Sequence, residues 1–443
     1  MRTGFMAAPQ TPESGHGMAR VTTSDPTLRG IDLVASMLKH WMSYGLVLVA
    51  GMATAVGCGG DGGTLPTAPA FVTVDFSTCD VADRAAWLAY QDGNGAWTKV
   101  TGVANVYTFN ITSGKGGVAY VSLGPGSLSS VQVQYMTQEA LTARTLTFCA
   151  PTPTRGKTVT GIAAGIDAAF HEAYVSLGGG TTTAFFPSAV NFQILGVKDG
   201  TQDLVGFRYG SGEADRAIIR RDQNIADNGS VGTLDFAGAE SFATASATIT
   251  VDGVGANDPL YHNLSYHVSA TCEAAPYGPL INIEGPGAGS FTAFGLPAAQ
   301  QRASDYHSIH VESGSRSVTE YFHTMAARTV TLGALLPTPT VTSLGGPYQR
   351  LQAVYTLPAA YAVTAFGYDD GTKFVNLSAT SGYLGGAAVT LGLADYSGLA
   401  GWDNNWAPPS TSSGHWNVSA ATSPVSVCTE NASFKSAVAG GMY

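Results

Sequence analysis

No stretch of twelve residues in this chain repeats apolar side chains at helical spacing, and this excludes helical fold classes from the outset. Short runs rich in Val, Thr and Tyr alternate instead with turn motifs such as those at 92–95 (Asp-Gly-Asn-Gly) and 369–371 (Asp-Asp-Gly). Val, Thr and Tyr favour strands, and Asn-Gly or Asp-Gly pairs favour hairpins. Lys and Glu, which favour helices, are scarce because charged residues make up only 12% of the 443 residues. The sequence therefore predicts an all-β protein.

The spacing of these runs predicts tandem β-sandwich domains. Residues 70–150 hold seven short runs with turns about every eight to twelve residues, which is typical of an immunoglobulin-like sandwich. Residues 241–443 form a larger β-rich domain, either one unit or two lobes divided near 337–340, where a Pro-Thr-Pro-Thr linker repeats that of 151–154. Short helical turns are expected at three places: 79–86, 137–142 and 296–303.

The intervening block, 155–240, carries several short motifs that occur together in one family. They are Val159-Thr160-Gly161, the run from Ala173 to Leu177, Phe192-Gln193-Ile194 and the run from Val197 to Val205. In these motifs the block resembles the carboxypeptidase regulatory-like, or transthyretin-like, sandwich. Members of that family are mostly non-catalytic accessory modules, so the resemblance implies a β-sandwich without an active site.

The start of the chain is similar to a bacterial lipoprotein signal. A basic segment at 39–41 precedes an apolar run at 44–57, which ends at Cys58. A membrane-spanning helix needs roughly twenty residues, so this shorter run, ending in small residues, fits a secretory signal. The resemblance implies that residues 1–57 are an upstream extension and signal peptide and that Cys58 carries the lipid. Met37 is the expected true start, with Met42 as the alternative.

This signal implies a location in the cell envelope. Residues 58–69 are rich in Gly, Thr and Pro and are expected to be a flexible tether. Gly59, directly after the cysteine, resembles lipoproteins exported to an outer membrane. The expected partner is therefore the membrane itself, contacted through the lipid anchor, and the alternative is ordinary secretion without lipid.

The other cysteines agree with export. Once Cys58 is set aside, four remain, an even number that suits a disulfide framework in an oxidising compartment. Sequence alone allows three pairings. The favoured pairing brackets one β-rich block with each disulfide: Cys79 with Cys149, and Cys272 with Cys428.

Charge excludes one class of partner. The formal net charge is −10, and the only basic pair, Arg220-Arg221, lies between Asp215 and Asp222. Nucleic-acid binding requires clustered Lys and Arg to neutralise phosphates, so no nucleic-acid partner is expected. No Cys-x-x-Cys pair or calcium loop is complete, and neither a metal nor a cofactor is expected.

One strand offers weak candidates for catalysis. Asp305 and His307 would share a face of this strand, whereas Glu312 would lie on the opposite face, since side chains alternate along a strand. No Gly-x-Ser-x-Gly nucleophile motif accompanies them. The favoured interpretation is that all three are strand residues with cross-strand hydrogen bonds.

A loop near the C-terminus has the composition of a sugar-binding site. Tryptophan faces stack on pyranose rings, and carboxylates and amides bind hydroxyl groups. The alternative is that these tryptophans cap a sandwich and are buried against it. The candidate ligand-binding residues are Trp402, Asp403, Asn404, Asn405, Trp406, His415 and Trp416.

Taken together, these features predict a lipid-anchored envelope protein without catalytic activity, which displays a surface for binding, adhesion or structural assembly. Its ligand would be a glycan or a protein of the cell envelope. The alternative is an extracytoplasmic hydrolase that acts on polysaccharide or peptide, with its site in 241–443.

Overall fold

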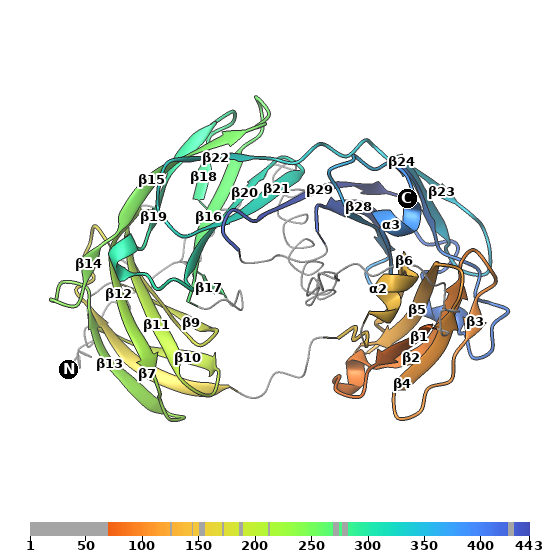
Figure 1. Cartoon of the computed structure of the whole chain (residues 1–443), viewed down its shortest axis with the longest axis horizontal. Helices are drawn as coiled ribbons and strands as arrows, with labels where there is room; N and C mark the ends of the chain where they lie inside the picture. The colour runs from red at the N-terminus through yellow and green to blue at the C-terminus, as the bar shows by residue number, and fades with distance from the viewer. Residues whose placement is uncertain are drawn as a thin grey trace, which may run out of the picture. The chain divides into compact units, whose positions relative to one another are not determined.

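The computed structural model describes the chain from residue 70 to residue 443. It leaves out the following positions within that span: 125, 144, 150–155, 171, 186–188, 211–212, 269–273, 277–281 and 424–428. The described part is all-β, as predicted, and its strands form facing sheets in a series of β-sandwiches (Figure 1). The sandwiches are referred to below as modules 1 to 4.

Module 1 begins the described part of the chain. Its elements are β1 (Ala70–Asp75), η1 (Val81–Asp83), β2 (Ala85–Asp92), β3 (Thr98–Lys99), β4 (Val106–Ile111), β5 (Lys115–Leu123), β6 (Ser129–Thr137) and α2 (Gln138–Thr142). Strand β1 pairs with β4, and β2 pairs with β3 and β5 in the facing sheet. The last of the seven runs predicted for residues 70–150, at 143–149, forms no named strand among its described residues, where Leu146 makes an isolated bridge with Val74.

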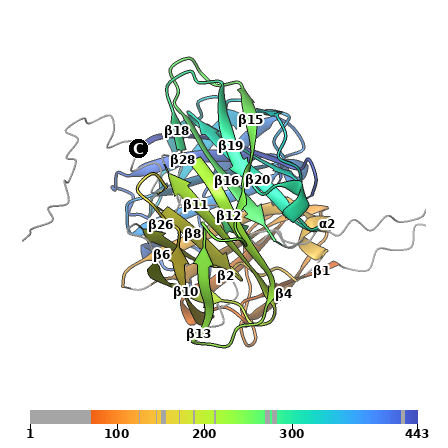
Figure 2. The same cartoon turned by 90° about the vertical axis from the view of Figure 1, so that its left-hand side faces the viewer.

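Module 2 covers the block that resembles the transthyretin-like sandwich. Its strands are β7 (Lys157–Ala164), β8 (Glu172–Leu177), β9 (Gly180–Phe185), β10 (Val190–Val197), β11 (Gln202–Gly210), β12 (Glu213–Gln223), β13 (Gly229–Asp235) and β14 (Phe242–Ala243). One sheet has the order β10-β7-β13, and the other has the order β14-β12-β11-β8-β9. Figure 2 shows β8, β11 and β12 of the second sheet side by side. The resemblance itself stays a prediction.

The predicted 241–443 region contains two further sandwiches. Module 3 consists of β15 (Ala245–Asp252), β16 (Leu260–His267), β17 (Ala274–Pro276), β18 (Asn282–Glu284), β19 (Ser290–Gly295), η2 (Ala298–Gln300), β20 (Tyr306–Ser313), β21 (Arg316–Phe322) and β22 (Arg328–Thr331). Module 4 consists of β23 (Thr340–Ser343), β24 (Leu351–Thr356), β25 (Val363–Asp369), β26 (Lys373–Thr380), α3 (Ser381–Leu384), β27 (Ala388–Gly392), η3 (Asn404–Trp406), β28 (His415–Ala421) and β29 (Ser433–Met442). The predicted seam at 337–340 follows β22 and ends at Thr340, the first residue of β23.

The modules repeat one strand connectivity. In module 2 the first strand pairs antiparallel with the fourth and parallel with the seventh, while the second pairs with the third and fifth. Module 3 has the same pairings between β15, β19 and β22 and between β16, β18 and β20. In module 4, β24 pairs with β27, and β23 takes the place of the seventh strand but runs antiparallel. The chain is therefore built from repeats of a single kind of sandwich.

The repeats are joined into a common sheet. Strand β6 of module 1 pairs in parallel with β26 of module 4, from Ser129 opposite Lys373 to Tyr135 opposite Ala379. Strand β21 of module 3 pairs with β29 of module 4, so that a 13-stranded sheet runs through these three modules in the described part of the chain (Figure 1). The sheet therefore contains strands from two of the domains that the sequence predicts, 70–150 and 241–443.

Sharing a sheet gives its strands two buried faces. On β2, Leu88 packs into the core of module 1, whereas Trp87 and Ala89 pack into the core of module 4. Strand β5 is consequently buried from Gly116 to Val121 without the alternation expected of a half-exposed strand. Each Å² of apolar surface removed from water contributes about 25 cal/mol. This second buried face therefore stabilises the contact between modules 1 and 4.

Candidate functional site

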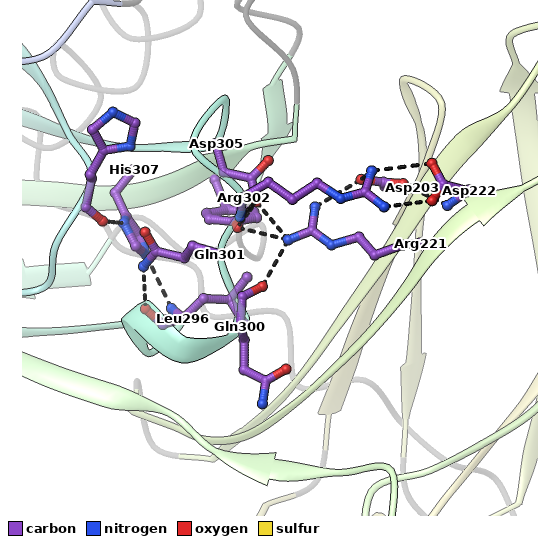
Figure 3. Close-up of polar contacts among 11 residues, drawn as sticks. Asp203, Arg221, Asp222, Leu296, Gln300, Gln301, Arg302, Asp305 and His307 are labelled. Carbon is purple, nitrogen blue, oxygen red and sulfur yellow. Dashed lines mark hydrogen bonds and ion pairs between the residues drawn. The ribbon is translucent and has the colours of Figure 1, made fainter.

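The weak catalytic candidates lie on or next to β20, as the strand periodicity predicted. Asp305 and His307 are fully buried, whereas Glu312 is half-buried on the opposite face. Figure 3 shows Asp305 and His307 near the η2 turn, where side chains of modules 2 and 3 meet. The three residues are therefore not brought together around one substrate position.

Asp305 is held in an ion-pair network rather than in an open site. Its Oδ2 accepts hydrogen bonds from Arg221 at 2.6 Å, from the Tyr266 hydroxyl at 2.5 Å and from the Arg302 backbone N–H at 2.8 Å. Arg221 also donates to Asp203 at 2.8 Å and to the Gln300 carbonyl oxygen at 2.8 Å (Figure 3). This network joins β11 and β12 of module 2 to β16 and β20 of module 3.

The electrostatics of this network keep Arg221 charged and Tyr266 protonated. Burial alone would lower the pKa of Arg221, but hydrogen bonds with Asp305 and Asp203 raise it, so the guanidinium stays charged. Burial and the nearby Asp305 carboxylate together raise the pKa of Tyr266, which keeps its phenol protonated as a donor. Asp305 thus serves as a structural acceptor within this network.

His307 is neutral and has both ring nitrogens engaged. Its Nδ1 lies 2.8 Å from the His323 carbonyl oxygen, and its Nε2 lies 3.1 Å from the Leu296 backbone N–H. Burial lowers the pKa of His307 to about 4, although the bond to the His323 carbonyl acts in the opposite direction. The tautomer that satisfies both contacts carries its proton on Nδ1. No ring nitrogen is left to take a proton from a substrate.

Glu312 belongs to a separate group on the other face of the sheet. One of its oxygens lies 2.9 Å from Nε2 of His310, and this hydrogen bond lowers the pKa of Glu312 despite burial of the carboxylate. Nδ1 of His310 lies 2.8 Å from the Thr319 hydroxyl. Both nitrogens of His310 are thus engaged in contacts with neighbouring side chains, as expected for strand residues.

A serine–histidine contact on this face was not predicted from the sequence. Nε2 of His267 lies 2.8 Å from the Ser308 hydroxyl, because β16 and β20 pair antiparallel in a register that places Ser265 opposite Ser308. This contact joins residues 41 positions apart, so only the register could have revealed it. His267 and Ser308 are 4% and 6% exposed. A nucleophile has to reach its substrate, and this pair is closed to one.

The predicted sugar-binding loop is packed against the module 4 core. The Trp402 ring lies 5.0 Å from the rings of Trp87 and Tyr396 and 5.4 Å from those of Tyr348 and Trp406. These four contacts are typical of a packed aromatic cluster. The half-buried indoles of Trp402 and Trp406 thus cover one edge of the core.

The polar residues of the loop form a local turn. Oδ1 of Asp403 accepts hydrogen bonds from the backbone and side-chain nitrogens of Asn405, at 2.9 and 3.0 Å. Oδ1 of Asn404 accepts from the Trp402 indole at 3.1 Å. All three polar residues stay exposed. They stabilise η3, and glycan binding by this loop stays a prediction.

The remaining loop candidates, His415 and Trp416, are the first residues of β28. The Trp416 indole donates to the Met442 carbonyl oxygen at 3.2 Å, and its ring packs over Gly441, where a Cβ atom would lie 2.7 Å from it. His415 lies opposite Asp369 in the sheet. The backbone pairing of β28 with β25 and β29 thus fixes both residues.

The disulfide prediction is confirmed for one pair. Cys79 and Cys149 are bonded, with their Cα atoms 5.8 Å apart, and close the core of module 1. The predicted partners Cys272 and Cys428, and the lipidation site Cys58, lie outside the described residues.

The described residues hold neither a cluster of metal ligands nor a membrane-spanning helix. Within the described ranges, no three His, Cys, Asp or Glu side chains are grouped as metal ligands would be. The same part of the chain holds no helix with the length and apolarity needed to cross a bilayer.

Comparison with known proteins adds little to this geometry. No protein-family model and no curated protein matches the chain. Among solved structures, the chain is similar to the Bacillus anthracis TIE protein, at 8% identity and a TM-score of 0.13, covering 60% of this chain and 51% of that one. It is also similar to the FN1–FN3 domains of chicken CNTN1, at 8% identity and a TM-score of 0.13, covering 60% and 93%. The chain thus spans about half the length of the TIE protein, and likenesses this weak carry no functional argument.

Proposed function

We propose that this chain is a lipid-anchored protein of the cell envelope, without catalytic activity, whose sandwich modules display a binding surface. The lipoprotein-like signal ending at Cys58 supports the anchor, and Gly59 supports an outer-membrane destination. The confirmed Cys79–Cys149 disulfide is what an oxidising compartment favours.

The observation that carries the non-catalytic part is the state of His307. Its pKa is lowered to about 4 by burial, and its two nitrogens already contact the His323 carbonyl and the Leu296 amide. A general base needs a free nitrogen within reach of a substrate and a pKa near the working pH. The alternative, a hydrolase centred on Asp305, His307 or Glu312, would require the Arg221 network to open.

The lipid anchor and the absence of catalytic activity are tested by separate measurements. Intact mass of the protein purified from its host, with and without an inhibitor of lipoprotein signal cleavage, is expected to show a lipid-modified chain that begins at Cys58. Proteolysis of whole cells then reports the exposed face of the membrane. Purified protein incubated with envelope polysaccharide is expected to bind it without releasing reducing ends. An unmodified chain that keeps residues 1–57 would contradict the anchor, and released sugar would contradict the non-catalytic role.

A further inference from the structure

A pocket of about 270 Å³ lies at the seam between modules 1 and 4. Pockets for drug-sized ligands run from about 300 to 1,000 Å³, so this one suits a smaller group. One wall comes from the turn after β2 and from β6, and the other comes from β24, α3 and β27. The residues used in the argument are Asn94, Tyr135, Arg350, Gln352, Tyr383 and Thr390.

Strand β27 offers unpaired backbone groups to this pocket. It lies at the edge of the sheet β23-β24-β27. The Leu393 N–H bonds to the Leu351 carbonyl across β24, so alternate residues, Leu391 and Val389, also direct their backbone groups toward β24. Thr390 and Gly392 therefore direct theirs toward the free edge. Both residues line the pocket.

Several side chains of the lining have unused hydrogen-bonding capacity. Within the described part of the chain, no hydrogen bond is made by the side-chain amides of Asn94 and Gln352 or by the hydroxyls of Tyr135 and Tyr383. Amides and phenols both donate and accept. A ligand rich in hydroxyl groups, which also donate and accept, matches this set.

The charges around the pocket favour an uncharged ligand. No carboxylate is among the lining residues. The Arg350 guanidinium is already engaged, donating to the Leu393 carbonyl at 3.0 Å, to the Gly345 carbonyl at 3.4 Å and to Asp395 at 3.4 Å. The Arg350 charge is thus offset by Asp395, and the other polar side chains of the lining are neutral.

Aromatic rings complete the lining and continue beyond it. The half-buried Tyr383 ring lies 5.0 Å from that of Tyr135, which lies 6.1 Å from that of Trp97. Trp97 in turn contacts Tyr396 at 5.3 Å, and Tyr396 contacts Trp402 at 5.0 Å. A run of rings thus connects the pocket with the tryptophan loop. Aromatic faces suit the apolar face of a sugar ring.

We propose that this pocket binds one residue of a neutral saccharide, with amides and phenols contacting its hydroxyls. The inference rests on the proposed binding function and gives it a site that is distinct from the loop at 402–406. The competing occupant is an extended peptide added to the free edge of β27. Mixed neutral donors and acceptors beside aromatic rings favour the sugar.

The test uses the purified full-length chain and saturation-transfer NMR with maltose, cellobiose, lactose and chitobiose, beside galacturonic acid and a mixture of unstructured pentapeptides. Thr390→Trp fills the pocket from an exposed position, and Thr292→Trp places the same ring at an exposed position of β19, the equivalent strand of module 3. Gln352→Ala removes one amide from the lining. Gln193→Ala, at an exposed position of β10, is its control.

At least one neutral disaccharide is expected to bind the wild-type chain. Thr390→Trp should abolish the signal while Thr292→Trp keeps it, and Gln352→Ala should weaken binding roughly 3- to 10-fold, as loss of a neutral hydrogen bond does. If Thr390→Trp does not fold, the test is the difference in saccharide affinity between Gln352→Ala and its control Gln193→Ala.

Other outcomes would overturn the inference. These are no binding of any neutral disaccharide, binding that survives both pocket variants, preference for galacturonic acid, or Thr390→Trp blocking peptides alone. The proposed function is checked separately by retention of wild-type protein on isolated envelope material. Retention that persists in Thr390→Trp would leave the binding role standing while removing this pocket from it.

Discussion

Removing the Asp305 carboxylate should weaken the contact between modules 2 and 3 and lower the free energy of unfolding of both. Asp305→Ala takes away the acceptor of Arg221, the Tyr266 hydroxyl and the Arg302 N–H, all within 2.8 Å. Breaking a buried ion pair by deleting one partner costs about 3–5 kcal/mol. Arg221 keeps its contact with Asp203 at 2.8 Å, so the loss of unfolding free energy should fall at the lower end of that range.

The assay has to observe the right modules. Of the six tryptophans, five lie in modules 1 and 4, and the sixth is Trp41. Fluorescence therefore reports the wrong part of the chain. Urea unfolding followed by hydrogen exchange of peptides from β12 and β20 reports the network directly, and these peptides should lose protection before those of β5.

Two further variants make the reasoning refutable. Arg302→Ala removes a 44% exposed side chain that pairs with the 65% exposed Asp222 and lies 3.6 Å from Asp203. A smaller loss than that of Asp305→Ala is expected because solvent screens the pair with Asp222. The double variant Arg221→Met with Asp305→Leu replaces the pair with apolar side chains and should recover most of the stability. An Asp305→Ala loss no greater than that of Arg302→Ala, or a double variant as unstable as the single one, would refute the argument.

Three other predictions concern single features. The pKa of His307 is lower in the folded state, so the unfolded chain binds the additional proton below about pH 6.5. The free energy of unfolding should therefore fall by roughly 3 kcal/mol between about pH 6.5 and pH 4. Urea midpoints at pH 7, 5.5 and 4.5 should show a smaller fall for His307→Gln than for the wild-type chain. Replacing Cys79 and Cys149 by serine opens a loop with a sequence separation of 70, which should destabilise module 1 by about 4 kcal/mol in the chain-entropy model; unchanged urea midpoints would contradict this. Trp402→Ala should lower the melting temperature more than Trp406→Ala because it loses contact with Trp87, Tyr348 and Tyr396, and a glycan array run on both variants tests the loop as a ligand site.

The sequence predicted the local structure well because turns and alternation are local properties. The hairpin motifs at 92–95 and 369–371 connect β2 to β3 and β25 to β26. The helical turns expected at 79–86, 137–142 and 296–303 are present as η1, α2 and η2. In each of these places, adjacent residues determine the backbone conformation.

Strand β29 was not predicted, and the reason lies in its neighbours. Its residues from Ala437 to Met442 include small side chains and lack the large apolar alternation of an ordinary strand. At Gly441 the structure requires a small residue, because the Trp416 ring occupies the space that a Cβ atom would take, and Ala437 is fully buried. A strand inserted between β21 and β28 is stabilised by backbone pairing on both edges, which no pattern within its own sequence reveals.

The candidate site shows the same division between local and distant information. Alternation along β20 correctly separated His307 from Glu312. It gave no sign of Arg221, which reaches Asp305 from 84 positions away. Tyr135 and Thr390 likewise line one pocket only because β6 pairs with β26, 244 positions along the chain.

This pairing has a consequence for how the modules depend on one another. Trp87 and Val121 of module 1 lie in the core of module 4, so module 4 cannot complete that core until module 1 docks. Modules of an ordinary tandem array fold independently of partners so distant in sequence. Here the pocket between Asn94 and Thr390 exists only when the first and last modules are joined. Binding at that seam would therefore stabilise the joined state by mass action, and ligand affinity and module docking would be measures of one equilibrium.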